Sequence, residues 1–286
     1  MGNEFSTTWP IREFFKKYII ISHIGIMNSK KNFFSSLLTM ICVLIGNTVY
    51  SDWDPQFLIS ESLIRGTYHK DLNSQKFINL KQQVLEFLAH TWCSEEKAEL
   101  IMELLILERP QTCVEIGVFT GSSFLPIAAT LKYLHQGRAY GIDAWSNDEA
   151  IKNMDECDPN KNWWATVDMK WVYQAYKKML KEWDLNSYCT TLKENSECAV
   201  SKLDAIDFLH MDGNYTHDSA LADAINYLPK VKIGGYILFS NLFFTVQGDQ
   251  PKMDAYFYLL DFCEIICGVD NDNTILLKKI SDIPEE

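Results

Sequence analysis

The 286-residue chain lacks cysteine pairs at metal-binding spacing and any surplus of basic residues. Its eight cysteines include no Cys-x-x-Cys pair, so neither a structural metal site nor a disulfide framework is expected. Cys263 and Cys267 stand four apart in an apolar run and are expected in the core. Lys and Arg number 26 against 38 Asp and Glu, a net charge of −12, which leaves no excess of cations to neutralise phosphates. The composition therefore argues against nucleic acid as a partner.

Internal repeats and low-complexity segments are also missing. With 47% hydrophobic residues, the chain is long enough to bury one large domain or two small ones. Disordered, collagen-like and small disulfide-rich classes are excluded by the same figures.

The amino-terminal segment contains a long uncharged stretch over residues 32–51, preceded by Lys30-Lys31 and followed by Asp52. A secretory signal has basic residues followed by apolar and then small residues, and this segment has that order. In this reading, translation begins at Met27 and the signal is cleaved after Ser51. A membrane anchor or interfacial helix, in contact with the membrane through residues 18–50, is the other reading. A cleaved chain would be exported, whereas a retained leader would leave it cytoplasmic or membrane-associated.

These observations divide the chain into three parts. We expect a signal-like or anchor leader over residues 1–51 and a helical extension or cap over residues 52–93. The main domain is expected over residues 94–286, beginning with a helix whose N-cap and first-turn acids are Ser94-Glu95-Glu96.

After Pro110, short apolar runs alternate with helical segments. The predicted strands are Thr112–Ile116, Ala139–Ile142, Tyr188–Leu192, Ala205–Met211, Gly235–Ser240, Glu264–Gly268 and Thr274–Leu277. The predicted helices are Ser122–Leu134, Asp168–Trp183, Ser196–Leu203, His217–Leu228 and Lys252–Phe262. This alternation predicts an α/β fold, a Rossmann-like doubly wound sheet of about seven strands with an N-terminal helical extension. Turn residues near Asp270 predict a hairpin and an antiparallel last strand.

A glycine-containing loop joins the first strand to its helix. Gly117 and Gly121 let the backbone approach a ligand, and the helix N-terminus offers free N–H groups. The third glycine of a dinucleotide fingerprint is missing, which disfavours NAD. The carboxylate of Glu115 suits an amino group better than a pyrophosphate.

The sequence Glu-Ile-Gly-Val-Phe-Thr-Gly at residues 115–121 resembles motif I of the class I S-adenosylmethionine-dependent methyltransferases. It is most similar to their catechol-type and antibiotic-sugar O-methyltransferase branch. Four further blocks follow in the family's order, at residues 141–145, 194–196, 207–215 and 228–237. The resemblance spans roughly residues 94–280 and implies transfer of a methyl group from S-adenosylmethionine to an oxygen of a small-molecule acceptor.

The resemblance also implies a cofactor site. The residues expected there are Glu115, Gly117, Phe119, Gly121, Ser122, Asp143, Ala144, Trp145, Asn195, Ser196 and Asp212. Asp143 ends a strand where a short carboxylate can accept from ribose hydroxyls, and a helix or turn cap is its other reading. Asn195 and Ser196 are expected near the adenine, and capping of the following helix is compatible with that role.

Two residues are expected at the reacting centre. Asp212 follows an apolar strand and should point toward it, and His217 is the first candidate for the base that removes a hydroxyl proton. His210 is the second candidate, and a purely capping or packing role for His217 stays open. The family commonly reads Asp-Gly-x-His-x-Tyr here, whereas this chain has exchanged the positions of His and Tyr.

Metal-dependent relatives place an acidic pair after the fifth strand, where this chain has Ser240-Asn241. A magnesium ion held by Asp212 and Asn241 would therefore have a weakened set of ligands. The sequence leaves open whether the chain uses a metal.

An aromatic-rich stretch from Trp145 to Tyr176 follows the second strand. It is expected either to form a substrate lid over the cofactor pocket or to pack a helix onto the sheet. The rival to an enzyme is an exported or membrane-tethered binding protein that keeps the fold without catalysis. A hydroxylase on the same scaffold is a third possibility, and homo-oligomer formation is left open.

Overall fold

The computed structural model describes residues 70–271 and 273–284. The predicted leader, its start at Met27, its cleavage after Ser51 and its membrane contact lie outside the described residues. None of the helices in the described ranges has both the length and the apolarity needed to cross a bilayer.

Within the described residues, seven strands form one sheet in the order β3-β2-β1-β4-β5-β7-β6. Their bounds are β1 Thr112–Ile116, β2 Arg138–Ile142, β3 Cys189–Leu192, β4 Ile206–Met211, β5 Val231–Phe239, β6 Cys263–Val269 and β7 Thr274–Lys279. Strands β1 to β5 pair in parallel, whereas β7 pairs antiparallel with both β5 and β6. The predicted doubly wound sheet and its antiparallel last strand are confirmed.

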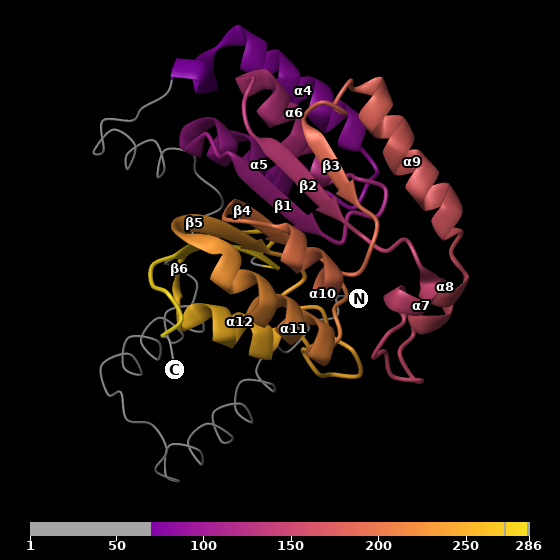
Figure 1. The fold of residues 1–286 in the computed structure, drawn as a ribbon. Coiled ribbons are helices and arrows are strands. Elements are labelled where there is room, and N and C mark those ends of the chain that lie inside the picture. The colour runs from indigo at the N-terminus through magenta and orange to yellow at the C-terminus, as the bar shows by residue number, and fades with distance from the viewer. Residues whose placement is uncertain (1–69, 272, 285–286) are drawn as a thin grey trace, which may run out of the picture. The chain divides into compact units, whose positions relative to one another are not determined.

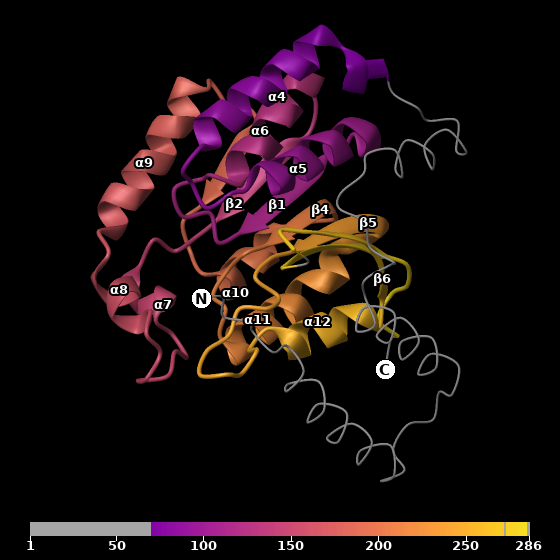
Figure 2. The same cartoon turned by 180° about the vertical axis from the view of Figure 1, so that it is seen from behind.

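Helices cover both faces of the sheet (Figures 1 and 2). The bounds are α4 Gln75–Leu88, α5 Glu95–Glu108, α6 Phe124–Leu134, α7 Asn147–Ala150, α8 Lys161–Thr166, α9 Met169–Glu182, α10 Ser196–Ala199, α11 His217–Tyr227 and α12 Met253–Leu260. Short 3-10 turns lie at Lys70–Asn73, Val200–Lys202 and Leu228–Lys230. One face carries α4, α5, α6 and α9, and the other carries α10, α11 and α12.

The two cores follow from the alternation of side chains along each strand. Along β4, Phe208 packs into the core on the α5 face, whereas its neighbour Leu209 packs into the core on the α11 face. Because both faces are covered, the central strands β1 and β4 are buried along most of their length.

The expected helical segment before Ser94 is confirmed for its described part. Helix α4 begins at the N-cap Ser74, whose hydroxyl accepts a hydrogen bond from the amide of Phe77 at 3.2 Å. Phe77, Val84 and Leu88 are buried in the core shared with α5 and α6. This helix is therefore part of the packed core beside the sheet.

Candidate active site

A cavity of about 320 Å³ lies where the parallel strands end, within the size range of small-molecule sites. Its walls come from the loops after β1, β2, β3, β4 and β5, from the start of α5, and from α7, α8 and α11. Figure 1 shows α7 and α8 at this end of the domain. This is the position where open α/β sheets bind their ligands.

The structure brings most of the predicted site residues together around this carboxyl-edge cavity. Those that line it are Gly117, Phe119, Ser122, Asp143, Ala144, Asn195, Ser196, Asp212 and Asn241. They follow five different strands, so the fold alone brings them together.

Gly117 allows the first strand to approach the fourth closely. Its φ is +86°, and a Cβ atom built on it would lie 2.2 Å from the carbonyl oxygen of Asp212. Only glycine fits there, because both the backbone angle and the space exclude a side chain.

Asp143 connects the loops after β1 and β2. Its Oδ2 accepts from the amide of Phe119 at 2.8 Å and its Oδ1 accepts from the amide of Trp145 at 2.7 Å. The indole Nε1 of Trp145 donates to the carbonyl of Phe119 at 2.8 Å. Phe119 and Trp145 both have left-handed backbones, with φ of +50° and +44°, and these three bonds hold them there. The turn-capping role of Asp143 is therefore present, and the same residue lines the cavity.

Asp212 is the centre of a polar group at the cavity wall. Its Oδ1 accepts from the side-chain amide of Asn241 at 2.6 Å. Its Oδ2 lies 3.6 Å from the ammonium of Lys97 and 3.7 Å from Nε2 of His210. The imidazole of His210 is fully buried behind it, with Nε2 2.9 Å from the hydroxyl of Ser240.

The charges of this group act on one another. Burial alone would raise the pKa of Asp212, but the Lys97 ammonium and neighbouring positive groups outweigh it and lower that pKa. Burial would lower the pKa of Lys97, but the charge of Asp212 outweighs it and raises that pKa. Lys252 lies deeper and donates to the carbonyl of Ser240 at 2.6 Å, and burial lowers its pKa to about 8.

A magnesium site at Asp212 and Asn241, which the sequence left open, does not fit these contacts. One oxygen of Asp212 already accepts from the amide of Asn241, and the other faces an ammonium. A hard divalent cation requires several oxygen ligands, and an ammonium at this distance repels it. No group of three or more metal-binding side chains occurs within residues 70–271 and 273–284.

Four predicted residues do not line the cavity, and Glu115 and Gly121 are two of them. Glu115 is fully buried on β1, where its Oε1 accepts from the hydroxyl of Ser123 at 2.6 Å and its Oε2 lies 3.4 Å from Nδ1 of His210. It therefore cannot meet an amino group of a ligand. Gly121 instead allows close packing, since a Cβ atom there would lie 2.4 Å from the methyl carbon of Met179.

Trp145 and His217 are the other two. The indole of Trp145 is buried and stacks on Tyr176, with 5.1 Å between ring centroids and 26° between ring planes. His217 is half-exposed at the start of α11, where Nδ1 lies 3.0 Å from Asp218 and Nε2 2.7 Å from Asp254. Its hydrogen bonds to these carboxylates raise its pKa, which favours imidazolium over a free base. The structure thus does not place His217 where it could take a proton from a ligand in the cavity.

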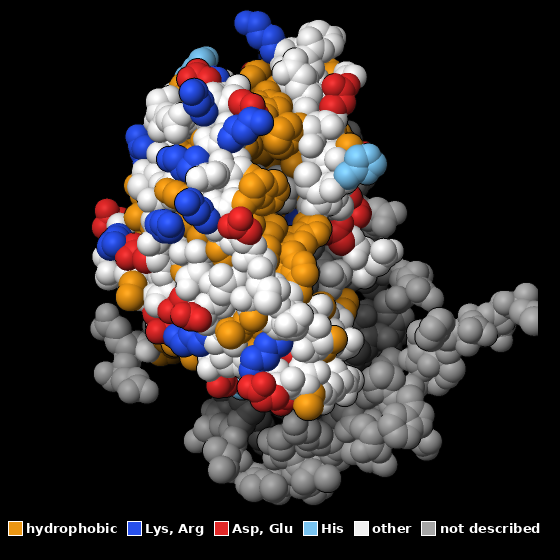
Figure 3. Space-filling model, turned by 90° about the vertical axis from the view of Figure 1, so that its right-hand side faces the viewer, with side chains coloured by type: hydrophobic (Ala, Val, Ile, Leu, Met, Phe, Trp, Pro, Cys, Tyr) orange, Lys and Arg blue, Asp and Glu red, His pale blue; other side chains and the backbone are white. Residues whose placement is uncertain are grey.

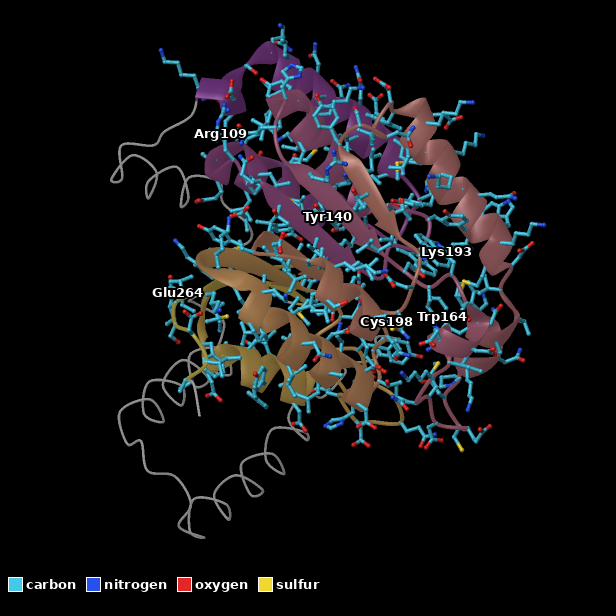
Figure 4. All side chains as sticks on the ribbon, in the orientation of Figure 1. Arg109, Tyr140, Trp164, Lys193, Cys198 and Glu264 are labelled. Carbon is cyan, nitrogen blue, oxygen red and sulfur yellow. The ribbon has the colours of Figure 1, made fainter. Side chains whose placement is uncertain are left out.

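The aromatic-rich stretch after β2 has two parts: one packs a helix beside the sheet, and the other lies at the cavity. Tyr173 and Tyr176 of α9 pack with Trp145 beside the sheet. Trp164 of α8 lines the cavity, at the end of the domain where Figure 4 labels it. It forms an aromatic group at the cavity mouth with Trp92, Phe119 and Trp163. Figure 3, which views the domain from this side, shows a band of hydrophobic side chains.

Polar contacts hold the aromatic-rich stretch to the loop after β4. The side-chain amide of Asn214 donates to the carbonyl oxygens of Ala150 at 3.3 Å and Lys152 at 3.0 Å. The hydroxyl of Tyr215 donates to Asp158 at 2.9 Å. The aromatic-rich stretch is thus fixed to the loop that begins with Asp212.

Sequence reasoning missed several lining residues, of which Trp92, Lys97, Glu149 and Asp223 carry the most distinctive side chains. Burial raises the pKa of Asp223 to about 6. The charged residues of the lining are Asp143, Glu149, Glu194, Glu197, Asp212 and Asp223 against Lys97 and Lys152. The cavity is therefore acidic and favours a cationic ligand.

Comparison with known proteins finds a match to a family model described as a methyltransferase domain, over residues 114–242. A search of curated proteins finds no match. Among solved structures, the O-methyltransferase NovP is 18% identical with a TM-score of 0.53, over 67% of this chain and 83% of that one. The SAH-bound methyltransferase PaMTH1 of Podospora anserina is 12% identical with a TM-score of 0.50, over 90% of this chain and 99% of that one.

These structures share the fold of this chain, and the family model covers the loops after β1, β2, β3, β4 and β5 that line the cavity. Residues 114–242 therefore match a methyltransferase-domain model, and the solved structures show that the chain has the fold of these methyltransferases.

Proposed function

We propose that this domain binds S-adenosylmethionine in the carboxyl-edge cavity and transfers its methyl group to an oxygen of a small-molecule acceptor. One observation carries the proposal: Gly117 after β1, Asp143 after β2 and Asp212 after β4 line a single cavity. The match to O-methyltransferase folds supports the choice of oxygen as acceptor. A binding protein without catalysis is less favoured, because the methyltransferase-domain match includes the loop with Asp212.

The cavity offers contacts for each part of the cofactor. The carboxylate of Asp143 suits the ribose hydroxyls, and Asn195 and Ser196 after β3 suit the adenine. The excess of carboxylates in the lining stabilises the sulfonium cation and the amino group of the donor.

The acceptor hydroxyl is placed beside Asp212, whose carboxylate accepts a hydrogen bond from it. The O–CH₃ bond forms as the S–CH₃ bond breaks, so that neutral S-adenosylhomocysteine leaves. The hydroxyl proton passes to the carboxylate as the O–H bond weakens, and then to water. Because the sulfonium is already a good leaving group, most of the rate comes from holding donor and acceptor at attack distance.

Calorimetry with S-adenosylhomocysteine tests the cofactor assignment. We expect micromolar binding to the full chain and a loss of about tenfold or more in Asp143→Ala, because that carboxylate both shapes the loop and faces the ligand. The matched control is Asp204→Ala, an exposed acid before β4 that does not line the cavity. Absence of heat at millimolar ligand, or equal affinity in Asp143→Ala, would refute the proposal.

A further inference from the structure

Lys97 is a buried lysine in the wall of the cavity. The residue is 5% exposed and lies in the first turn of α5. Its backbone is fixed there because the hydroxyl of the N-cap Ser94 accepts from its amide at 3.0 Å. Its ammonium lies 3.6 Å from Oδ2 of Asp212 and lines the same cavity as Asp143 and Asn195.

This position is costly for a positive charge. Burial disfavours the ammonium, and the N-terminal turn of a helix carries the positive end of the helix dipole. Among the described residues, Asp212 is the carboxylate within ion-pair distance of Lys97. The charge of Asp212, together with the charges of Asp270 and Glu115, outweighs burial and raises the pKa of the lysine.

Asn241 completes the arrangement. Its amide donates to the other oxygen of Asp212, so an N–H group and an ammonium together occupy both oxygens of the carboxylate. A divalent cation would have to displace one or both of these positively polarised groups from Asp212.

We propose that Lys97 is the resident cation of the acceptor site, so that the positive charge facing the acceptor oxygen belongs to the chain and the site is closed to divalent metals. The assignment rests on the proposed methyl transfer in this cavity. An ammonium has three N–H donors, and Asp212 can accept from only one or two of them. The remaining N–H is available to the acceptor oxygen, where it stabilises negative charge as the O–H bond weakens.

The test measures charge, and it requires no knowledge of the acceptor. S-adenosylmethionine carries a positive sulfonium and S-adenosylhomocysteine is neutral at sulfur, so the ratio of their affinities reports the potential in the cavity. Removal of the ammonium in Lys97→Met leaves Asp212 unpaired, and we expect the ratio to shift toward S-adenosylmethionine by about fivefold or more. Lys97→Arg should keep the ratio within about twofold of the wild type, because its charge remains.

A Mn²⁺ titration gives the second measurement. The wild type is expected to bind no Mn²⁺ at millimolar concentration in the presence of S-adenosylhomocysteine. The double variant Lys97→Met/Asn241→Asp removes the ammonium and adds a carboxylate, and it is expected to gain Mn²⁺ binding. The matched control is Lys81→Met, a partly buried lysine paired with Glu99 and Glu103 away from the cavity, which should change neither measurement.

Three results would overturn the assignment while cofactor binding stays intact. They are an unchanged affinity ratio in Lys97→Met, Mn²⁺ binding by the wild type that Asp212→Asn abolishes, and a double variant that still excludes Mn²⁺. Failure of the wild type to bind S-adenosylhomocysteine is a different result, because it refutes the proposed function itself.

Discussion

At the scale of single residues, the site depends on positions where only one residue type fits. Gly117 combines a left-handed backbone with contact to the backbone of Asp212, so it joins the loops after β1 and β4. Gly234 has a similar φ of +82° but no atom within 4 Å of the position of its missing Cβ atom. Alanine substitutions at the two glycines therefore separate the cost of a positive φ from the cost of a steric overlap.

Gly117→Ala is expected to lower the free energy of unfolding by about 3 kcal/mol or more, because strain at positive φ adds to a steric overlap. Gly234→Ala should cost about 1 kcal/mol, since only the backbone angle is strained. Urea denaturation of both variants checks this difference. Equal losses of stability would show that the contact with Asp212 contributes nothing.

Lys97 shows why part of the site could not be predicted at this scale. In the sequence it is a polar residue in the first turn of a helix, a position that is usually solvated. Its role depends on the packing of α5 beside the end of β4, and no local pattern records that contact. His217 lies outside the cavity lining for the related reason that α11 turns its imidazole toward Asp254 on α12.

At the scale of elements, the apolar periodicity predicted the sheet well. Strand β1 has the predicted bounds, and most other strand and helix ends differ by one or two residues. Strand β5 begins at Val231, earlier than predicted. The prediction missed its start because residues 232–234 are exposed and show no buried-strand pattern. Helices α7 and α8 are four and six residues long, too short to show a helical period, and they were not predicted.

The tryptophans of the short helix α8 and of the loop before α5 allow a fluorescence test of the ligand position. Trp164 and Trp92 line the cavity, so binding of S-adenosylhomocysteine should change the tryptophan fluorescence. We expect Trp164→Phe and Trp92→Phe each to reduce this change, because each removes a fluorophore that the ligand approaches. Trp171→Phe removes an exposed indole of α9 outside the cavity and should leave the change intact. A change that is lost only in Trp171→Phe would place the ligand elsewhere.

At the scale of the whole molecule, charged residues are unevenly distributed along the sequence. The chain is 47% hydrophobic, and its amino-terminal stretch over residues 32–51 contains no charged residue. The leader and the location of the protein stay predictions from this pattern. They bear on function because S-adenosylmethionine is made in the cytosol.

Cell fractionation with N-terminal sequencing of the mature protein tests the leader. If the segment is a cleaved signal, the mature chain begins at Asp52 and is found outside the cytoplasm. If it is an anchor, the chain keeps its amino terminus and sediments with membranes. A full-length chain in the soluble fraction would contradict both the cleaved signal and the membrane anchor, and would match a retained leader on a cytoplasmic protein.

The position of β7 between β5 and β6 has a consequence for how the protein is made. Strand β5 keeps an unpaired edge until residues 274–279 insert beside it, and β6 has no partner in the sheet before then. An open edge of this kind can pair with other chains. The nascent polypeptide therefore exposes the edge of β5 until β7 has been made, and a chain that ends within β6 keeps β5 as the edge of its sheet.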